Sequence, residues 1–115
     1  MMDVTITASG GTNNYGMWND SSSPTIQNSA IGAGASVGIS DGLHNVASTG
    51  TYTIKIDNSQ ITGSTSTIFQ TSQYTTKVGA SQLAGAGAFP VTGTTYVCVA
   101  SYNGNYVALN SSCQP

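Results

Sequence analysis

His44 is the only imidazole of this 115-residue chain, and Asp41 lies three positions before it. Together with one of the many serines, this pair could supply a Ser-His-Asp triad, in which the histidine activates a hydroxyl as a nucleophile. Asp41-Gly42, however, is a dipeptide typical of a tight turn, and residues three apart on such a turn do not easily support triad geometry. We therefore interpret His44 as a surface histidine beside a turn and expect no catalytic site.

The other ionisable side chains are sparse. The carboxylates are completed by Asp3, Asp20 and Asp57, and the cations are Lys55 and Lys77. Acid–base catalysis needs two titratable groups with different environments in one cleft, whereas these residues are spread along the chain at turns and strand ends. One histidine and two cysteines are too few for a zinc site, and no haem-attachment motif is present. The sequence predicts neither enzyme activity, nor a metal, nor a cofactor.

Two short patterns are weak matches to known sites. The glycine-rich segment 30–38 resembles a phosphate-binding loop but has no following helix and no adjacent lysine, so we interpret it as a connector rich in turns. Asn19-Asp20-Ser21 and Asn110-Ser111-Ser112 match the glycosylation sequon, and matches by chance are expected in a chain so rich in serine and threonine. Both are interpreted as surface loops.

Aromatic residues offer a different chemistry. Tyr15, Trp18, Tyr102 and Tyr106, with nearby asparagines, could stack on a sugar and bond to its hydroxyls. The alternative is that Trp18 pins a loop to the core. A carbohydrate-binding module is therefore an alternative function.

Composition narrows the class of protein. Hydrophobic residues make up 38% of the chain, charged residues only 5%, and the net charge is -2. We expect a single folded domain over residues 1–115, because 6 tyrosines and many β-branched residues are untypical of disorder. Two lysines without arginine cannot form the basic surface that nucleic acid or an anionic membrane needs.

The two cysteines point to an oxidising compartment. Cys98 and Cys113 are an even pair in a small polar chain, so one disulfide is the simplest expectation, with two reduced core thiols as the alternative. Met1-Met2-Asp3 lacks the basic and apolar regions of a signal peptide, as in the mature product of export. The apolar runs are far shorter than a membrane-spanning helix.

Alternation of apolar and polar residues predicts short strands. The pattern is clear over 3–8 and clearest over 50–57, and one or two further strands are expected within 65–78. No segment predicts a helix of three turns. The fold class predicted is all-β and antiparallel.

Glycine, asparagine and serine dominate the segments between these strands. Residues 9–36 are expected to form a long irregular loop, and residues 35–46 a hairpin turning at Asp41-Gly42. Over 79–93, at most one helical turn at 80–84 is expected before glycines and Pro90 end it, so that the chain crosses over there.

Asn103-Gly104 predicts a two-residue hairpin between strands over 94–102 and 105–109. If Tyr102 pairs with Asn105, Cys98 falls opposite Leu109. The tail then curls back to bring Cys113 beside Cys98.

The segment from Tyr96-Val97-Cys98 to Asn110-Ser111-Ser112-Cys113-Gln114-Pro115 resembles the disulfide-closed end of type IV pilin heads. More narrowly, most of the chain is similar to the separately encoded globular subunit of split type IV pilins of Geobacter. Ordinary type IV pilins begin with a long apolar helix, and this sequence opens directly into a strand.

The resemblance implies a structural subunit of an extracellular filament, exported through the periplasm, that covers a short helical pilin and lies beside other copies. We expect the helix to bind a groove lined by apolar strand faces at Tyr52, Ile54, Ile56, Val97 and Val99. The alternatives are a secreted carbohydrate-binding β module, perturbed at Trp18 by glycans, and a phage or virion decoration protein that assembles without a helical partner.

Overall fold

The structure is a computed structural model that describes residues 1–85, 91–92 and 95–115, and its regular elements in those ranges are all strands. They form three sheets, each built from every third strand of the chain. Sheet 1 contains β1 (Thr5–Ala8), β4 (Ala30–Ala33), β7 (Gln60–Gly63), β10 (Gln82–Ala84) and β13 (Tyr102–Asn103). Sheet 2 contains β2 (Asn14–Asp20), β5 (Ser40–Val46), β8 (Ser66–Gln70) and β11 (Val91–Thr92). Sheet 3 contains β3 (Thr25–Gln27), β6 (Tyr52–Asp57), β9 (Tyr74–Gly79) and β12 (Tyr96–Val99).

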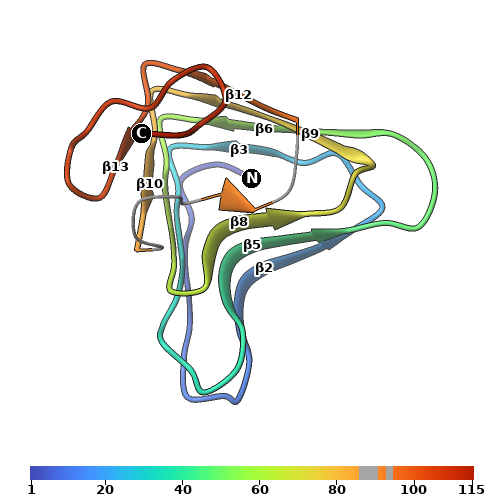
Figure 1. The fold of residues 1–115 in the computed structure, drawn as a ribbon. Helices are drawn as coiled ribbons and strands as arrows, with labels where there is room; N and C mark the ends of the chain where they lie inside the picture. The colour runs from blue at the N-terminus through green and yellow to red at the C-terminus, as the bar shows by residue number, and fades with distance from the viewer. Residues whose placement is uncertain (86–90, 93–94) are drawn as a thin grey trace.

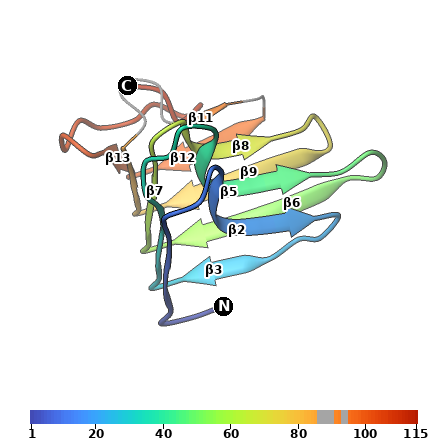
Figure 2. The same ribbon diagram turned by 90° about the horizontal axis from the view of Figure 1, so that it is seen from below.

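The chain therefore winds as a coil that visits the three sheets in turn (Figure 1). Every pairing between these strands is parallel. Successive coils stack along one axis, with the N-terminus at one end of the stack and the C-terminus at the other (Figure 2). This architecture is a β-solenoid, in which each coil contacts only its neighbours.

Apolar residues at equivalent positions of successive coils form the core. In sheet 1 the inward row is Ile31, Ile61 and Leu83, each at most 1% exposed. In sheet 3 the inward row is Ile26, Ile56, Val78 and Cys98. Like residues thus stack at the strand spacing of about 4.8 Å, and each added coil covers the row below it.

A repeated serine shapes the corner between sheets 3 and 1. Ser29, Ser59, Ser81 and Ser101 are all buried there. The hydroxyls of the last three accept the backbone N–H of the serine one coil earlier, at 3.1, 3.0 and 3.3 Å. All four donate to the carbonyl two residues before them. The residue before each serine has a positive φ of 44–51°, which turns the chain.

Glycine allows sheets 1 and 2 to approach where the strands of sheet 2 bend (Figure 1). A Cβ on Gly42 would lie 2.7 Å from the carbonyl oxygens of both Thr62 and Thr67. A Cβ on Gly63 would overlap the Ser66 carbonyl oxygen. The bend therefore requires glycine at positions 42 and 63, because a larger side chain does not fit between the two backbones.

The all-β class and the Cys98–Cys113 disulfide are confirmed. The antiparallel arrangement is wrong, because strands adjacent in sequence lie in different sheets and pair only with strands one coil away. The strand patterns over 3–8, 50–57 and 65–78 correspond to β1, β6, and β8 with β9.

The prediction of a long irregular loop over 9–36 is wrong, because that segment contains β2, β3 and β4. The hairpin over 35–46 is wrong because Asp41-Gly42 lies inside β5. Instead of a helical turn at 80–84 the chain forms β10. Residues 86–90 and 93–94 of the predicted crossover and of the following strand lie outside the described residues.

The C-terminal hairpin has a different register from the one expected. An antiparallel bridge joins Tyr102 to Ala108, not to Asn105. Leu109 donates its N–H to the Ser101 carbonyl, and Cys98 donates to Ser111, so Leu109 is not opposite Cys98. Residues 104–115 thus lie over the last coil and are tied to it by the disulfide.

Candidate functional site

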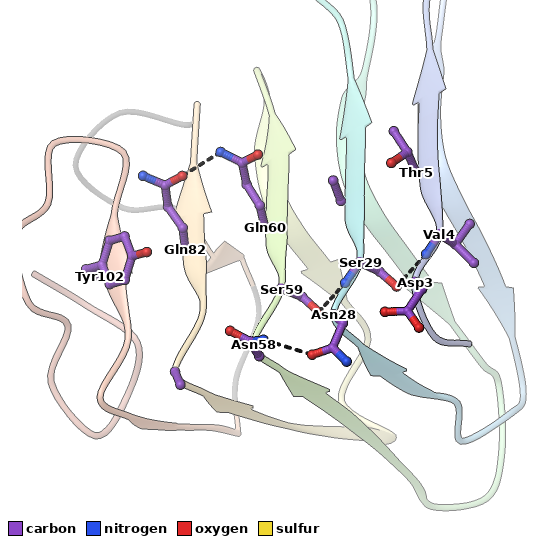
Figure 3. A pocket seen from close by; sticks show the side chains of 12 residues that line it. Asp3, Val4, Thr5, Asn28, Ser29, Asn58, Ser59, Gln60, Gln82 and Tyr102 are labelled. Atoms are coloured by element: carbon purple, nitrogen blue, oxygen red, sulfur yellow. Dashed lines mark hydrogen bonds between the residues drawn. The ribbon is translucent and has the colours of Figure 1, made fainter.

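A groove runs across the outer face of sheet 1, beside the serine corner (Figure 3). Its volume is about 630 Å³. The groove crosses the strands, so it follows the solenoid axis from the first coil to the last. It is lined by Asp3, Val4, Thr5, Asn28, Ser29, Ala30, Asn58, Ser59, Gln60, Ala80, Gln82 and Tyr102.

Amide side chains form two short ladders in this groove. Asn58 Nδ2 donates to Asn28 Oδ1 at 2.8 Å, and Gln60 Nε2 donates to Gln82 Oε1 at 2.5 Å (Figure 3). A primary amide has two donor hydrogens and an oxygen with two lone pairs. These bonds between coils therefore fix the orientation of each amide and leave further donors and acceptors for a ligand.

The two ends of the groove differ chemically. Asp3 lies at the β1 end, and Tyr102 lies at the β13 end (Figure 3). The Tyr102 ring stacks on that of Tyr106, with centroids 5.2 Å apart and planes at 13°. The groove can thus offer uncharged hydrogen-bonding groups along its length and an aromatic surface at one end.

A second cluster, on the outer face of sheet 2, is a row of aromatic rings in which each ring comes from a different coil. Trp18, His44 and Phe69 stand in register, with Trp18 4.5 Å from His44 and Phe69 4.7 Å from His44. Tyr15 packs edge-on against Trp18 at 5.0 Å. Trp18 is 53% exposed, so the row is partly open to ligands or partners.

The structure brings Asp41 and His44 together. His44 Nδ1 lies 2.7 Å from Asp41 Oδ2, and both residues are buried. The expectation of a surface histidine is therefore wrong, because β5 bends at Gly42 and the bend closes the gap between positions 41 and 44. Both faces of the imidazole lie against rings, of Trp18 and Phe69, which makes this polar pair part of a packed row.

Among the described residues, no group of three or more histidine, cysteine or acidic side chains could hold a metal ion. In the same part of the chain, no helix has the length and apolar character that a membrane crossing needs.

The two short patterns are placed differently from our expectation. The segment 30–38 contains β4 and is not only a connector. Asn19 of the first sequon is buried in β2 and donates to Asn45 Oδ1 at 3.3 Å and to the Ser22 carbonyl at 3.1 Å. It is thus not on a surface loop, whereas Asn110 is exposed.

The expected helix-binding groove does not exist as one surface. Ile54 and Ile56 face the core at 0% and 2% exposure, whereas Val97 and Val99 face outward at 42% and 66%. Val97 and Val99 thus lie on the opposite face of sheet 3 from Ile54 and Ile56, because the inward positions of β12 are Tyr96 and Cys98. The outward valines instead line a smaller groove, of about 350 Å³, with Lys55 and Lys77.

The fold places this chain in the class of β-solenoid proteins. Comparisons with protein-family models, with curated proteins and with solved structures return no match.

Proposed function

We propose that this chain is a non-catalytic module that binds a linear, uncharged polysaccharide along the groove of sheet 1. The observation that carries the proposal is the pair of amide ladders, Asn28–Asn58 and Gln60–Gln82, in a groove that follows the solenoid axis. Sugar hydroxyls both donate and accept hydrogen bonds, as amides do. A linear polysaccharide presents such hydroxyls at regular intervals, which suits side chains repeated at the strand spacing.

The aromatic end and the low charge support the same ligand class. Tyr102 can stack on the apolar face of a sugar ring. Among the described residues that line the groove, Asp3 at one end is the only one with a charged side chain, and no lysine is there to attract an acidic polymer. The disulfide Cys98–Cys113 is compatible with export to the compartment where polysaccharides are displayed.

Affinity electrophoresis of the chain through gels containing glucan, mannan, xylan or galactan tests this proposal, with polygalacturonate as the charged comparison. We expect retardation by at least one neutral polymer. Replacing Gln60 and Gln82 together by alanine removes two ligand-facing amides. We expect a loss of about 1.4 kcal/mol of binding free energy, which corresponds to tenfold weaker binding.

Gln27→Ala is the matched control, because Gln27 is an exposed glutamine that lines the groove of sheet 3 and not that of sheet 1. It should bind as the parent chain does. If no neutral polymer retards the chain, or if the control loses as much affinity as the double variant, the groove is not a polysaccharide site.

The second proposal is the structural role in an extracellular filament that the pilin resemblance implies. It is supported by the disulfide and by a surface with few charges, which allows dense packing without strong repulsion. Sheared surface filaments would be captured with an antibody to this chain, and bound polypeptides identified by mass spectrometry. Recovery in constant ratio with a short apolar helical polypeptide supports this role, and recovery of the chain alone counts against it.

A further inference from the structure

Both lysines of the chain lie in the smaller groove, of about 350 Å³, on the outer face of sheet 3. Lys55 of β6 and Lys77 of β9 are paired residues of neighbouring strands, and both side chains are exposed. They therefore stand one strand spacing apart along the solenoid axis. A chain with only these two lysines and no arginine thus brings both cations together in one groove.

The charges of this lysine pair are not neutralised by the chain itself. In the described part of the chain, the one ion pair joins Asp41 to His44, and neither lysine is paired with a carboxylate. Asp57 lines the same groove but is not close enough to either ammonium group to form an ion pair. Like charges at paired positions of neighbouring strands repel each other. An anion held between the two ammonium groups replaces this repulsion by attraction, so the groove favours an anionic ligand.

The rest of the groove indicates the shape and polarity of that ligand. The groove crosses sheet 3 from β3 to β12, so it follows the solenoid axis. Thr25, Gln27 and Asp57 line it with exposed hydroxyl, amide and carboxylate groups, all of which can bond to a hydroxyl. At β12, Val97 and Val99 are 42% and 66% exposed and offer an apolar surface. A matching ligand is elongated and carries anionic groups, hydroxyls and apolar C–H faces.

The spacing of charge separates the classes of linear polyanion. Duplex DNA carries one phosphate charge per about 1.7 Å of its axis, whereas the backbones of the two lysines are about 4.8 Å apart. A polysaccharide of uronic acids carries one carboxylate per sugar, and the length of one sugar unit is comparable to the strand spacing. The flexible lysine stems let each ammonium group reach a carboxylate of this polymer.

We propose that the groove of sheet 3 binds a linear polysaccharide of uronic acid units, with carboxylates held by Lys55 and Lys77 and sugar C–H faces on Val97 and Val99. This groove shares no lining residue with the groove of sheet 1. The inference therefore goes beyond the proposed binding of a neutral polysaccharide and does not depend on it.

Affinity electrophoresis of the chain at low salt, through gels containing polygalacturonate or polymannuronate, tests this proposal. Polyglutamate is the comparison polymer, because it has carboxylates but no sugar. We expect retardation by at least one uronate polymer, more than by polyglutamate, and less retardation as added salt screens the charges. The net charge of the chain is -2, so its overall charge does not attract these polymers. Absence of retardation by both uronate polymers overturns the proposal, as does equal or stronger retardation by polyglutamate.

Two variants locate the site. Lys55→Gln combined with Lys77→Gln removes both charges and keeps most of each stem. It should weaken uronate binding by about tenfold or more. Val97→Asp places a carboxylate in register with Lys77, where it competes with the ligand for the ammonium group, and it should weaken binding to a similar extent.

Ser64→Asp combined with Ser72→Asp is the matched control for charge. Both serines are exposed outside the groove, and this control lowers the net charge by the same amount as the double lysine variant. Its retardation by uronate polymers should match that of the parent chain. Equal weakening in this control overturns the proposal.

Circular dichroism checks that each variant keeps its strands. If Val97→Asp does not fold, the double lysine variant decides, since both lysines are exposed. Retardation of the folded groove variants to the parent extent overturns the proposal. Gln60→Ala combined with Gln82→Ala should keep its uronate binding, so a failure of the sheet 3 site is distinguished from a failure of the sheet 1 site.

Discussion

The serine corner supplies the sharpest test of what holds the coils in register. Ser59 is 7% exposed, and its hydroxyl accepts the buried N–H of Ser29 at 3.1 Å while donating to the Asp57 carbonyl at 2.8 Å. Ser59→Ala removes both bonds and leaves the Ser29 N–H without its partner inside the corner. A buried donor left unpaired costs about 1–3 kcal/mol. Because the Asp57 carbonyl is only partly buried and can bind water, we expect a total loss near 2 kcal/mol.

Urea unfolding with the disulfide intact measures this loss as a change in the free energy of unfolding, extrapolated to water at unchanged slope. Ser81→Ala should lose a similar amount, since its hydroxyl accepts the Ser59 N–H at 3.0 Å. Ser72→Ala is the control, because Ser72 is exposed in a turn, and surface changes stay within about 0.5 kcal/mol. Stabilities of Ser59→Ala and Ser72→Ala that agree within error would refute the serine corner as a source of stability.

Three further changes test the close approach at the bend of sheet 2, the ionisation of a buried tyrosine and the disulfide. Gly42→Ala places a Cβ 2.7 Å from two carbonyl oxygens and should lower the free energy of unfolding by about 3 kcal/mol, whereas Gly32→Ala, with no atom nearer than 3.8 Å, should be tolerated. Burial is the main cause and the nearby Asp41 charge the second cause that raise the pKa of Tyr96 above its usual 10.0. As the pH rises past 10, Tyr96 therefore loses its proton in the unfolded chain but keeps it in the folded chain, which favours unfolding. The urea midpoint of unfolding should fall above that pH, and it should fall less in Tyr96→Phe. Reduction of the disulfide between Cys98 and Cys113, which are 15 residues apart, should lower the free energy of unfolding by about 3 kcal/mol and with it the melting temperature. An unchanged melting temperature would contradict this.

The coil leaves a short repeat in the sequence, which the alternation of apolar and polar residues does not reveal. Asn28-Ser29-Ala30-Ile31, Asn58-Ser59-Gln60-Ile61 and Ala80-Ser81-Gln82-Leu83 share a turn residue, a serine, an outward residue and a core residue. Such self-similarity is the signature of a solenoid. The steps from Ser29 to Ser59, to Ser81 and to Ser101 are uneven, because the turns between strands differ in length, and this hides the repeat from a search for one fixed period.

The candidate site was predictable only in part. The sequence predicts Tyr102 as an aromatic that could bind sugar, and Tyr102 lines the groove. Asn28, Asn58, Gln60 and Gln82 are not singled out by the sequence, since each is an ordinary polar residue next to or at the start of a strand until the coils place them in pairs. The sequence does not predict that Asp41 and His44 pair, because Asp41-Gly42 is typical of a tight turn, whereas in the structure it is the place where β5 bends.

Local sequence determined the all-β class, the strands with clear alternation such as β1 and β6, the disulfide partners and the near absence of charge. Side chains alternate between faces in parallel and antiparallel strands alike, so the alternation at Ile54 and Ile56 defined β6 without defining its neighbours. Tertiary structure decided those neighbours: Ile56 pairs with Ile26 and Val78, each one coil away. Stacking of like residues across coils selects this parallel register, and the groove of sheet 1 and the stacked rings of Trp18, His44 and Phe69 exist only because of it.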